Sequence, residues 1–135
     1  MKKIIGMIIL FLFSLIGYSQ TNTKNTVEHV SIIDLIANGN LYKEKKLYIK
    51  GYFVDSGRYG RLFLNKEDAQ YSIYVNSLMI NYDFFDNCER NANDLFDLNN
   101  SYISLTAYFE DIKNIYQGGL IFNIYYFSKL EVDEN

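Results

Sequence analysis

The chain has 135 residues, of which 49% are hydrophobic and 17% aromatic, and its formal net charge is −3. This length suits a single domain with a core of its own. The acidic balance argues against a polyanion-binding protein, because such proteins attract their ligand with a positive field. One cysteine, Cys88, excludes an intrachain disulfide, and the many tyrosines favour a β-rich core.

Residues 1–19 have the three parts of a secretory signal peptide. Lys2 and Lys3 give a positive start, thirteen uncharged residues follow, and Gly17 and Ser19 are small residues at −3 and −1 of a cleavage site. A membrane-spanning helix needs about 20 apolar residues, so an uncleaved anchor is the weaker alternative. We therefore expect a periplasmic or secreted protein without a membrane anchor. Loss of the two lysines would change the net charge from −3 to −5.

A polar lead-in and a short helix precede the expected strands. Residues 20–30 form this lead-in, which is predicted to be flexible. Ser31 and Asp34 have the spacing of a capping box, and Asn38 with Gly39 supplies a stop. The sequence therefore predicts a helix between these signals, at the start of a domain that covers residues 31–132.

Five segments are predicted to be strands, because apolar residues alternate along them. They cover residues 46–54, 61–65, 71–76, 102–109 and 120–127. Ten of their side chains are expected to share one core: Leu47, Ile49, Phe53, Leu62, Leu64, Ile73, Val75, Ile103, Leu105 and Phe109. Gly51, inside the first strand, indicates a bulge or a sharp bend.

A helix is predicted between the third and fourth strands. Phe85, Cys88, Ala92 and Leu95 recur at helical spacing, and Asp83 is a candidate cap. Three strands, a helical connection and two more strands match the order of an OB-fold, a five-stranded and partly open barrel. We therefore expect a mainly β protein with short helices, built as an OB-fold-like barrel with a leading helix. A small β-sandwich is the alternative.

The stretches "IIDLIANGNLYKEKKLYIKGYF" and "LFLNKEDAQYSIYVNSLMIN", with the weaker "SYISLTAYFE", resemble a group of small exported bacterial proteins of unassigned function. The patterns of that group are "LLANP..Y.GK", "V.V.GY" and "LYL..EDA.Y". The leading part is also similar to exported or membrane-associated OB-fold domains likened to tRNA-anticodon-binding domains. This sequence departs from the patterns at Gly39, where they have proline, and at Glu44, where they have glycine. The resemblance implies a barrel and no catalytic residue.

No catalytic residue, metal ligand or cofactor is predicted. His29 is the single histidine, and it has no partner at the spacing of a zinc site. Cys88 is expected to be a buried structural thiol. Adjacent carboxylates rarely face each other across a substrate as glycoside hydrolysis requires, so three acidic pairs are expected to be solvated turn residues. These pairs are Glu67 with Asp68, Glu110 with Asp111, and Asp83 with Asp86.

The outward face of the first strand and of the following hairpin is the candidate partner-binding site. Its residues are Tyr48, Lys50, Tyr52, Arg58, Tyr59 and Arg61. OB-folds bind single strands through such basic and aromatic residues, but the acidic charge and the predicted export disfavour nucleic acid. Tyrosine and arginine are also favoured at protein interfaces. The site requires that Tyr52 and Arg61 are at least partly exposed while Phe53 is buried, because neighbours along a strand point to opposite sides.

The function predicted from the sequence is that of an exported, non-enzymatic, OB-like binding module. Its expected partner is a protein or a glycan of the cell envelope or outside the cell. Two alternatives remain open, namely a single-stranded nucleic-acid binder and a hydrolase with an unrecognised acidic site.

Overall fold

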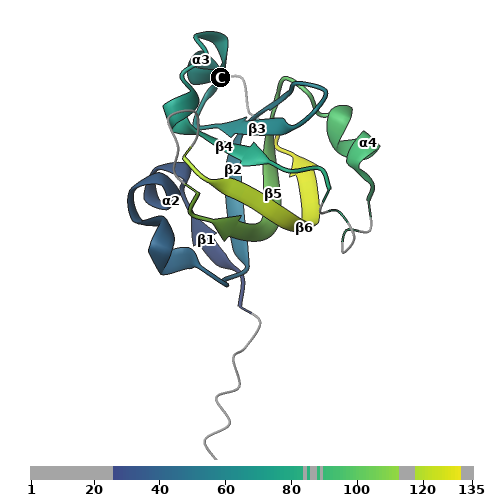
Figure 1. The fold of residues 1–135 in the computed structure, drawn as a ribbon. Helices are drawn as coiled ribbons and strands as arrows, with labels where there is room; N and C mark the ends of the chain where they lie inside the picture. Colours follow the sequence, from purple (N-terminus) through teal and green to yellow (C-terminus); the bar gives the residue numbers. More distant parts are fainter. Residues whose placement is uncertain (1–25, 84, 86–87, 89, 113–117, 132–135) are drawn as a thin grey trace, which may run out of the picture.

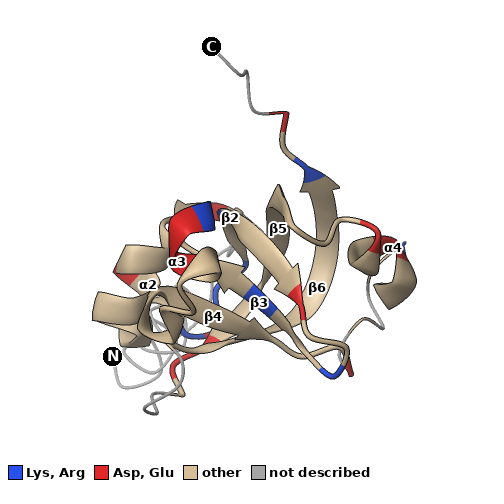
Figure 2. Cartoon of the chain, turned by 90° about the horizontal axis from the view of Figure 1, so that it is seen from above, with Lys and Arg blue, Asp and Glu red and all other residues tan. Residues whose placement is uncertain are grey.

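The structure is a computed structural model that describes residues 26–83, 85, 88, 90–112 and 118–131. Strands curl around a common core, and short helices lie at the rim (Figure 1). Seen from above, α2 and α3 lie on one side of the barrel and α4 on the other (Figure 2). The predicted signal peptide at residues 1–19 lies outside the described residues. Within the described part, no helix is long and apolar enough to cross a membrane.

Six strands form one sheet that closes on itself. They are β1 (Glu28–Val30), β2 (Leu47–Asp55), β3 (Gly60–Phe63), β4 (Ser77–Ile80), β5 (Ser101–Glu110) and β6 (Leu120–Lys129). Their order is β1-β2-β3-β4-β6-β5. A further pairing of β2 with β5 closes the five strands other than β1 into a ring. β4 and β6 are parallel and pair at Met79–Leu120 and Ile80–Ile121. This short junction leaves the ring partly open, and the five-stranded ring confirms the predicted OB-fold-like class.

The strand β2 has two neighbours on one edge and a single neighbour on the other. β1 pairs with residues 47–49 in parallel, and β3 pairs with residues 52–55 in antiparallel. β5 follows the opposite edge from Leu47 to Phe53 without a break in register. The lead-in predicted for residues 20–30 is therefore corrected at its end, because Glu28–Val30 is a strand held by β2.

Gly51 lies between the residues of β2 that pair with β1 and those that pair with β3. The expected bulge is absent at Gly51, because the pairing of β2 with β5 continues there without a break. A Cβ at this position would lie 2.6 Å from the carbonyl oxygen of Phe63, 2.7 Å from Leu62 Cγ and 2.8 Å from Ile32 Cδ1. The glycine is thus needed for close approach of backbone and side chains. It lets β3 and the leading helix pack directly against β2.

The leading helix α2 (Ile32–Asn38) begins as predicted, and a 3₁₀ turn, η1 (Gly39–Tyr42), follows it. Ser31 is its N-cap, because the hydroxyl oxygen accepts a hydrogen bond from the Asp34 backbone N–H at 3.1 Å. Ile32 and Leu35 are fully buried. The apolar face of α2 is therefore part of the barrel core.

The third strand is not where the alternation predicted it. Residues 66–76 form a short helix, α3 (Lys66–Gln70), then a turn with Ser72 in the left-handed region at φ 57°, then a 3₁₀ turn, η2 (Tyr74–Asn76). Ile73 and Val75 are consequently 38% and 59% exposed instead of buried. β4 is the third strand of the ring, and its Leu78 and Ile80 are the residues that enter the core.

Asp68 is the reason for this local fold. Its carboxylate accepts hydrogen bonds from the side-chain amides of Asn76 at 3.1 Å and Asn65 at 3.3 Å. Its backbone N–H donates to Asn65 Oδ1 at 2.7 Å, which caps α3. The predicted solvated turn is therefore wrong for Asp68, which is 7% exposed. These side-chain contacts compete successfully with a strand ladder.

The core otherwise follows the prediction. Seven of the ten expected residues are buried in it: Leu47, Ile49, Phe53, Leu62, Ile103, Leu105 and Phe109. Leu64 is partly buried against this cluster. The core also includes residues outside the expected set: Ile32, Leu35, Leu78, Ile80, Leu95, Ala107, Ile121, Ile124 and Phe127.

The helix between the third and fourth strands is shorter than predicted. α4 covers Ala92–Phe96, and Asn91, not Asp83, caps it through a capping box with Asp94. Cys88 precedes the helix, and it is a free thiol that packs, partly buried, against the core. The predicted helical period therefore identified the apolar contacts but placed the helix start too early.

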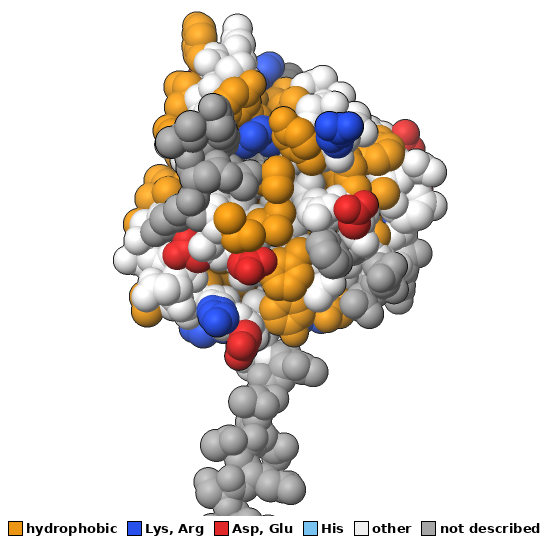
Figure 3. Space-filling model, viewed as in Figure 1, with side chains coloured by type: hydrophobic (Ala, Val, Ile, Leu, Met, Phe, Trp, Pro, Cys, Tyr) orange, Lys and Arg blue, Asp and Glu red, His pale blue; other side chains and the backbone are white. Residues whose placement is uncertain are grey.

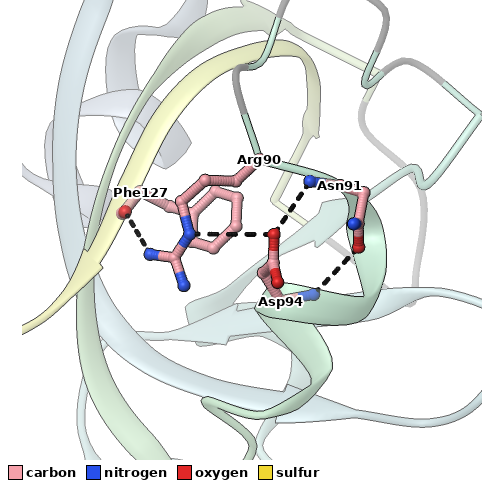
Figure 4. Close-up of polar contacts among 4 residues, drawn as sticks. All are labelled: Arg90, Asn91, Asp94 and Phe127. Carbon is pink, nitrogen blue, oxygen red and sulfur yellow. Dashed lines mark hydrogen bonds and ion pairs between the residues drawn. The ribbon is translucent and has the colours of Figure 1, made fainter.

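Arg90 fastens α4 to the barrel (Figure 4). Its guanidinium lies 4.4 Å from the centre of the Phe127 ring and donates a hydrogen bond to the Phe127 carbonyl oxygen at 3.2 Å. Its Nε lies 3.9 Å from an Asp94 carboxylate oxygen. β6 has passed its short pairing with β4 by this point. Arg90 thus donates a hydrogen bond to a backbone carbonyl of β6 beside the gap in the ring, where the edge of β6 would otherwise be unpaired.

Tyr82 ties the segment before α4 to the end of β2. Its hydroxyl donates a hydrogen bond to Asp55 Oδ1 at 2.7 Å, and its ring lies edge-on to Phe96 at 4.8 Å. Burial raises the pKa of the Tyr82 phenol well above its ordinary value of 10.0, and the hydrogen bond to Asp55 and its negative charge raise it further. The phenol therefore stays protonated in the folded chain at pH values where it ionises in the unfolded chain.

We expect this difference to destabilise the protein in alkali. The unfolded chain loses the Tyr82 proton near pH 10 while the folded chain keeps it, so the stabilisation is complete below pH 10 and is lost above it. Urea unfolding at a series of pH values should show a steeper alkaline loss of stability in the wild type than in Tyr82→Phe. Parallel losses in the two proteins would show that the contact with Asp55 does not hold the proton. Tyr126→Phe, at a position 55% exposed, is the matched control.

Candidate binding site

The six residues of the sequence-predicted binding face do not form one surface. Tyr48 and Lys50 lie on β2 beside His29 of β1, and the rings of Tyr48 and His29 are 4.5 Å apart. These three side chains line a hollow of about 350 Å³, together with Ser31 and Leu64. We call this the β1–β2 hollow, and it holds two of the six residues of the predicted face, Tyr48 and Lys50.

Tyr52 and Arg61 are buried, so the expectation that both are exposed is wrong. Tyr52 is 8% exposed, and its hydroxyl donates to the Asn100 carbonyl oxygen at 3.1 Å. Arg61 is 9% exposed, donates to Ser77 Oγ at 3.0 Å and lies 4.5 Å from the centre of the Tyr74 ring. Phe53, the residue next to Tyr52 on β2, is fully buried as predicted.

The physical reason is that residues 66–76 fold over this part of the outer face. Tyr52 borders a hollow shared with Lys66, Ala69 and Gln70 of α3. The period of two placed Tyr52 on the correct side of the strand. It could not show that a second layer covers that side.

Arg58 and Tyr59 lie in the β2–β3 hairpin turn, as the sequence predicted. Gly57 has φ 81°, and the hydroxyl of Ser56 donates to the Tyr59 carbonyl oxygen at 2.6 Å. Arg58 is exposed, whereas the half-buried Tyr59 ring lies 5.4 Å from the Arg61 guanidinium. Tyr59 is thus part of the packing around Arg61, and Arg58 stands apart from Tyr48 and Lys50.

A larger hollow lies between the β5–β6 hairpin and the turn after η1. Its volume is about 440 Å³. We call it the aromatic hollow, and it is lined by Lys43, Glu44, Tyr108, Phe109, Glu110, Phe122 and Asn123. Figure 3 shows a band of hydrophobic side chains across β6 and the adjoining part of β5, with acidic and basic side chains on either side.

An irregular stretch of the β5–β6 ladder brings the rings of this hollow together. Thr106 pairs with Tyr126 and Tyr108 pairs with Phe122, so the one intervening β5 residue faces residues 123–125 of β6. Asn123 is one of the three β6 residues in this irregular stretch, and its backbone adopts the left-handed conformation, with φ 47°. A bulge of this kind re-aims the side chains around it.

Three aromatic rings consequently share one side of the hairpin. Tyr108 and Phe122 are stacked, with centroids 6.0 Å apart and planes at 29°. Tyr125 meets Tyr108 edge-on at 5.8 Å, and the Lys46 ammonium lies 3.7 Å from the centre of the Tyr125 ring. Burial and then the neighbouring Tyr108 raise the pKa of the Tyr125 phenol above its ordinary value of 10.0.

The aromatic hollow combines an apolar floor with polar groups of every kind at its rim. Tyr108 and Phe122 are half-buried, whereas Lys43, Glu44 and Glu110 are exposed. An ammonium donates hydrogen bonds, carboxylates accept them, and the amide of Asn123 does both. Largely apolar hollows of about 300–1,000 Å³ with a few polar groups are typical of small-ligand sites. Within the described residues, no group of three or more metal-ligating side chains gathers.

Sequence reasoning missed this hollow. A signal was nevertheless present, because Tyr108, Phe122 and Tyr125 are large aromatic residues outside the expected core. The pattern alone did not bring them together, since the bulge depends on the pairing of β5 with β6.

No family model matches the chain, and no curated protein sequence matches it significantly. Among solved structures, the chain is similar to a protein described as an aspartyl-tRNA synthetase from Leishmania major Friedlin, with a TM-score of 0.43 and 8% sequence identity. The match covers 82% of this chain and 22% of that protein, so the chain spans about a fifth of its length. A likeness at this level shows neither family nor activity, and the OB-like fold rests on the closed order of the strands.

Proposed function

We propose that the protein is an exported, non-enzymatic binding module that takes a ligand of the cell envelope or the cell exterior in the aromatic hollow. The observation that carries this proposal is the pair of stacked, half-exposed rings of Tyr108 and Phe122 at the floor of a polar-rimmed hollow. Aromatic side chains supply large contact area at binding sites. OB-like barrels present such surfaces on their strands and loops.

The placement of His29 and Cys88 argues against a histidine- or cysteine-based reaction in the aromatic hollow. These residue types are frequent bases and nucleophiles. His29 of β1 lies against the Tyr48 ring at a tilt, whereas Cys88 packs against the core near Phe85. Neither lines the aromatic hollow.

The charge distribution supports a ligand other than nucleic acid. Lysine and arginine residues are scattered over β3, α3, the end of β6 and loops, with acidic residues between them (Figure 2). Tyr52 and Arg61, two of the six residues on which a nucleic-acid face would depend, are buried. With the predicted signal peptide removed, the chain would carry a net charge of −5, and this opposes a polyanion.

The β1–β2 hollow is the competing site, because it holds Tyr48 and Lys50 of the sequence-predicted face. Both hollows can be tested in one experiment. The chain from residue 20, labelled at its amino terminus, is mixed with washed envelope material from the producing cells and sedimented. We expect Tyr108→Ala to weaken co-sedimentation by roughly tenfold or more, which corresponds to the loss of one aromatic contact.

Two matched tyrosine variants make the result specific. Tyr48→Ala removes the ring of the β1–β2 hollow, and Tyr71→Ala removes a ring that is 72% exposed on the far segment. Both should co-sediment like the wild type. Loss with Tyr48→Ala and retention with Tyr108→Ala would move the site to the β1–β2 hollow. Equal co-sedimentation of all three variants would refute a binding function for either hollow.

A further inference from the structure

We infer that the ligand of the aromatic hollow is a saccharide, bound through the flat C–H face of a gluco-configured pyranose ring. The inference rests on the binding function proposed above and names its ligand class. Its starting point is the pairing of two aromatic rings, Tyr108 and Phe122, with a mixed polar rim in one hollow of about 440 Å³.

The floor fits the face of a pyranose. In a gluco-configured ring the hydroxyl groups are equatorial, so both faces present C–H groups. The Tyr108 and Phe122 rings lie at 29° to each other, and Tyr125 stands edge-on beside them at 67°. Tyr108 and Phe122 both line the hollow, where a half-buried ring can offer its face to a sugar, and Tyr125 packs against Tyr108 from outside the lining. The face of an aromatic ring carries negative charge density and attracts the positive edge of C–H groups.

The rim fits a ring of hydroxyl groups. Each hydroxyl is both a donor and an acceptor, so a matching site needs both kinds of partner. Glu44 and Glu110 supply acceptors, Lys43 supplies donors, and Asn123 supplies one of each from its amide. An apolar ligand would gain nothing from these groups, whereas a polyhydroxylated ligand can hydrogen-bond to them.

The same rim disfavours a nucleotide chain. Bases stack on aromatic rings as sugars do, but a nucleic-acid strand also brings a line of phosphates. Two carboxylates, Glu44 and Glu110, border the hollow against one ammonium that lines it, Lys43. A neutral oligosaccharide meets no such repulsion.

The rings are held in place before any ligand arrives. The Lys46 ammonium lies 3.7 Å from the centre of the Tyr125 ring, and Tyr125 in turn abuts Tyr108. The Asn123 backbone is fixed by the bulge of the hairpin. Such a preformed site loses less side-chain freedom on binding, which favours weak, small ligands such as sugars.

The test uses the chain from residue 20 and two pure probes, cellotetraose and its N-acetylated amino-sugar counterpart, chitotetraose. Titration calorimetry should show binding of at least one probe by the wild type. Tyr108→Ala should weaken it by about tenfold or more, and Tyr108→Phe, which keeps the ring, should restore most of the affinity. Glu110→Gln, at an exposed position where folding is not at risk, should weaken it severalfold. Tyr48→Ala should leave it unchanged.

Three outcomes would overturn the inference. Neither probe binds the wild type, although envelope co-sedimentation still depends on Tyr108; the binding function then stands and its ligand is not a pyranose. Alternatively, a probe binds, but Tyr48→Ala and not Tyr108→Ala abolishes binding. Finally, an oligothymidylate binds more tightly than either sugar, with an affinity that falls steeply as salt rises. If envelope co-sedimentation is instead unchanged in every hollow variant, the proposed function itself is refuted.

Discussion

Replacement of Phe53 by alanine is expected to lower the free energy of unfolding by about 3–5 kcal/mol. Phe53 is fully buried, and it pairs with Leu62 of β3 on one side and Ser101 of β5 on the other. It therefore stands where three strands of the ring meet. A ring of paired strands collapses poorly around a lost side chain, so most of the cavity should remain. Urea unfolding of the chain from residue 20 measures the loss.

Val75→Ala is the matched control for this prediction. Both residues belong to the set that alternation assigned to the core, but Val75 is 59% exposed on η2. Its truncation should change stability by less than about 0.5 kcal/mol. Similar losses at the two positions would contradict the placement of residues 71–76 outside the barrel.

Gly51→Ala is expected to cost about 3 kcal/mol, at the upper end of the range for overpacking a core. The added methyl group would lie 2.6 Å from the Phe63 carbonyl oxygen, and a backbone atom cannot rotate away as a side chain can. β3 or α2 would have to move. The unfolding midpoint should fall sharply, whereas Lys50→Ala, at the exposed neighbouring position, should leave it nearly unchanged. An unchanged midpoint in Gly51→Ala would mean that β2 and β3 are not this close.

The local signals in the sequence predicted the ring well where one face of a strand is buried. Leu47, Ile49 and Phe53 alternate along β2, and each is fully buried. Ser31 starts α2 because a cap is a contact between residues three positions apart. Contacts of this kind are visible in the order of residues, so the predictions of β2 and of the start of α2 were confirmed.

The failures come from contacts that alternation does not encode. Tyr71, Ile73 and Val75 have the period of a strand, but the hydrogen bonds of Asp68 to Asn65 and Asn76 fold the segment into turns. That misplacement also hid the burial of the candidate site residues. Tyr52 and Arg61 point outward as predicted, and the folded segment covers them.

The aromatic hollow was beyond local reasoning for a similar reason. Tyr108 and Phe122 face each other because β5 and β6 pair, and Tyr125 joins them because residues 123–125 bulge. A bulge changes which side a residue faces without changing the composition of the strand. The hollow follows from the register of two strands, which the sequence did not fix.

The central claim is that a ligand enters the aromatic hollow, and a residue-by-residue map of binding tests it most directly. Amide NMR spectra of the ¹⁵N-labelled chain from residue 20 would be recorded with increasing cellotetraose, then with chitotetraose and with solubilised envelope material. The largest shifts are predicted at residues 108–110 and 122–125, with residues 29 and 48–50 unchanged. Shifts concentrated at residues 29 and 48–50, with none at 108–110, would contradict the claim.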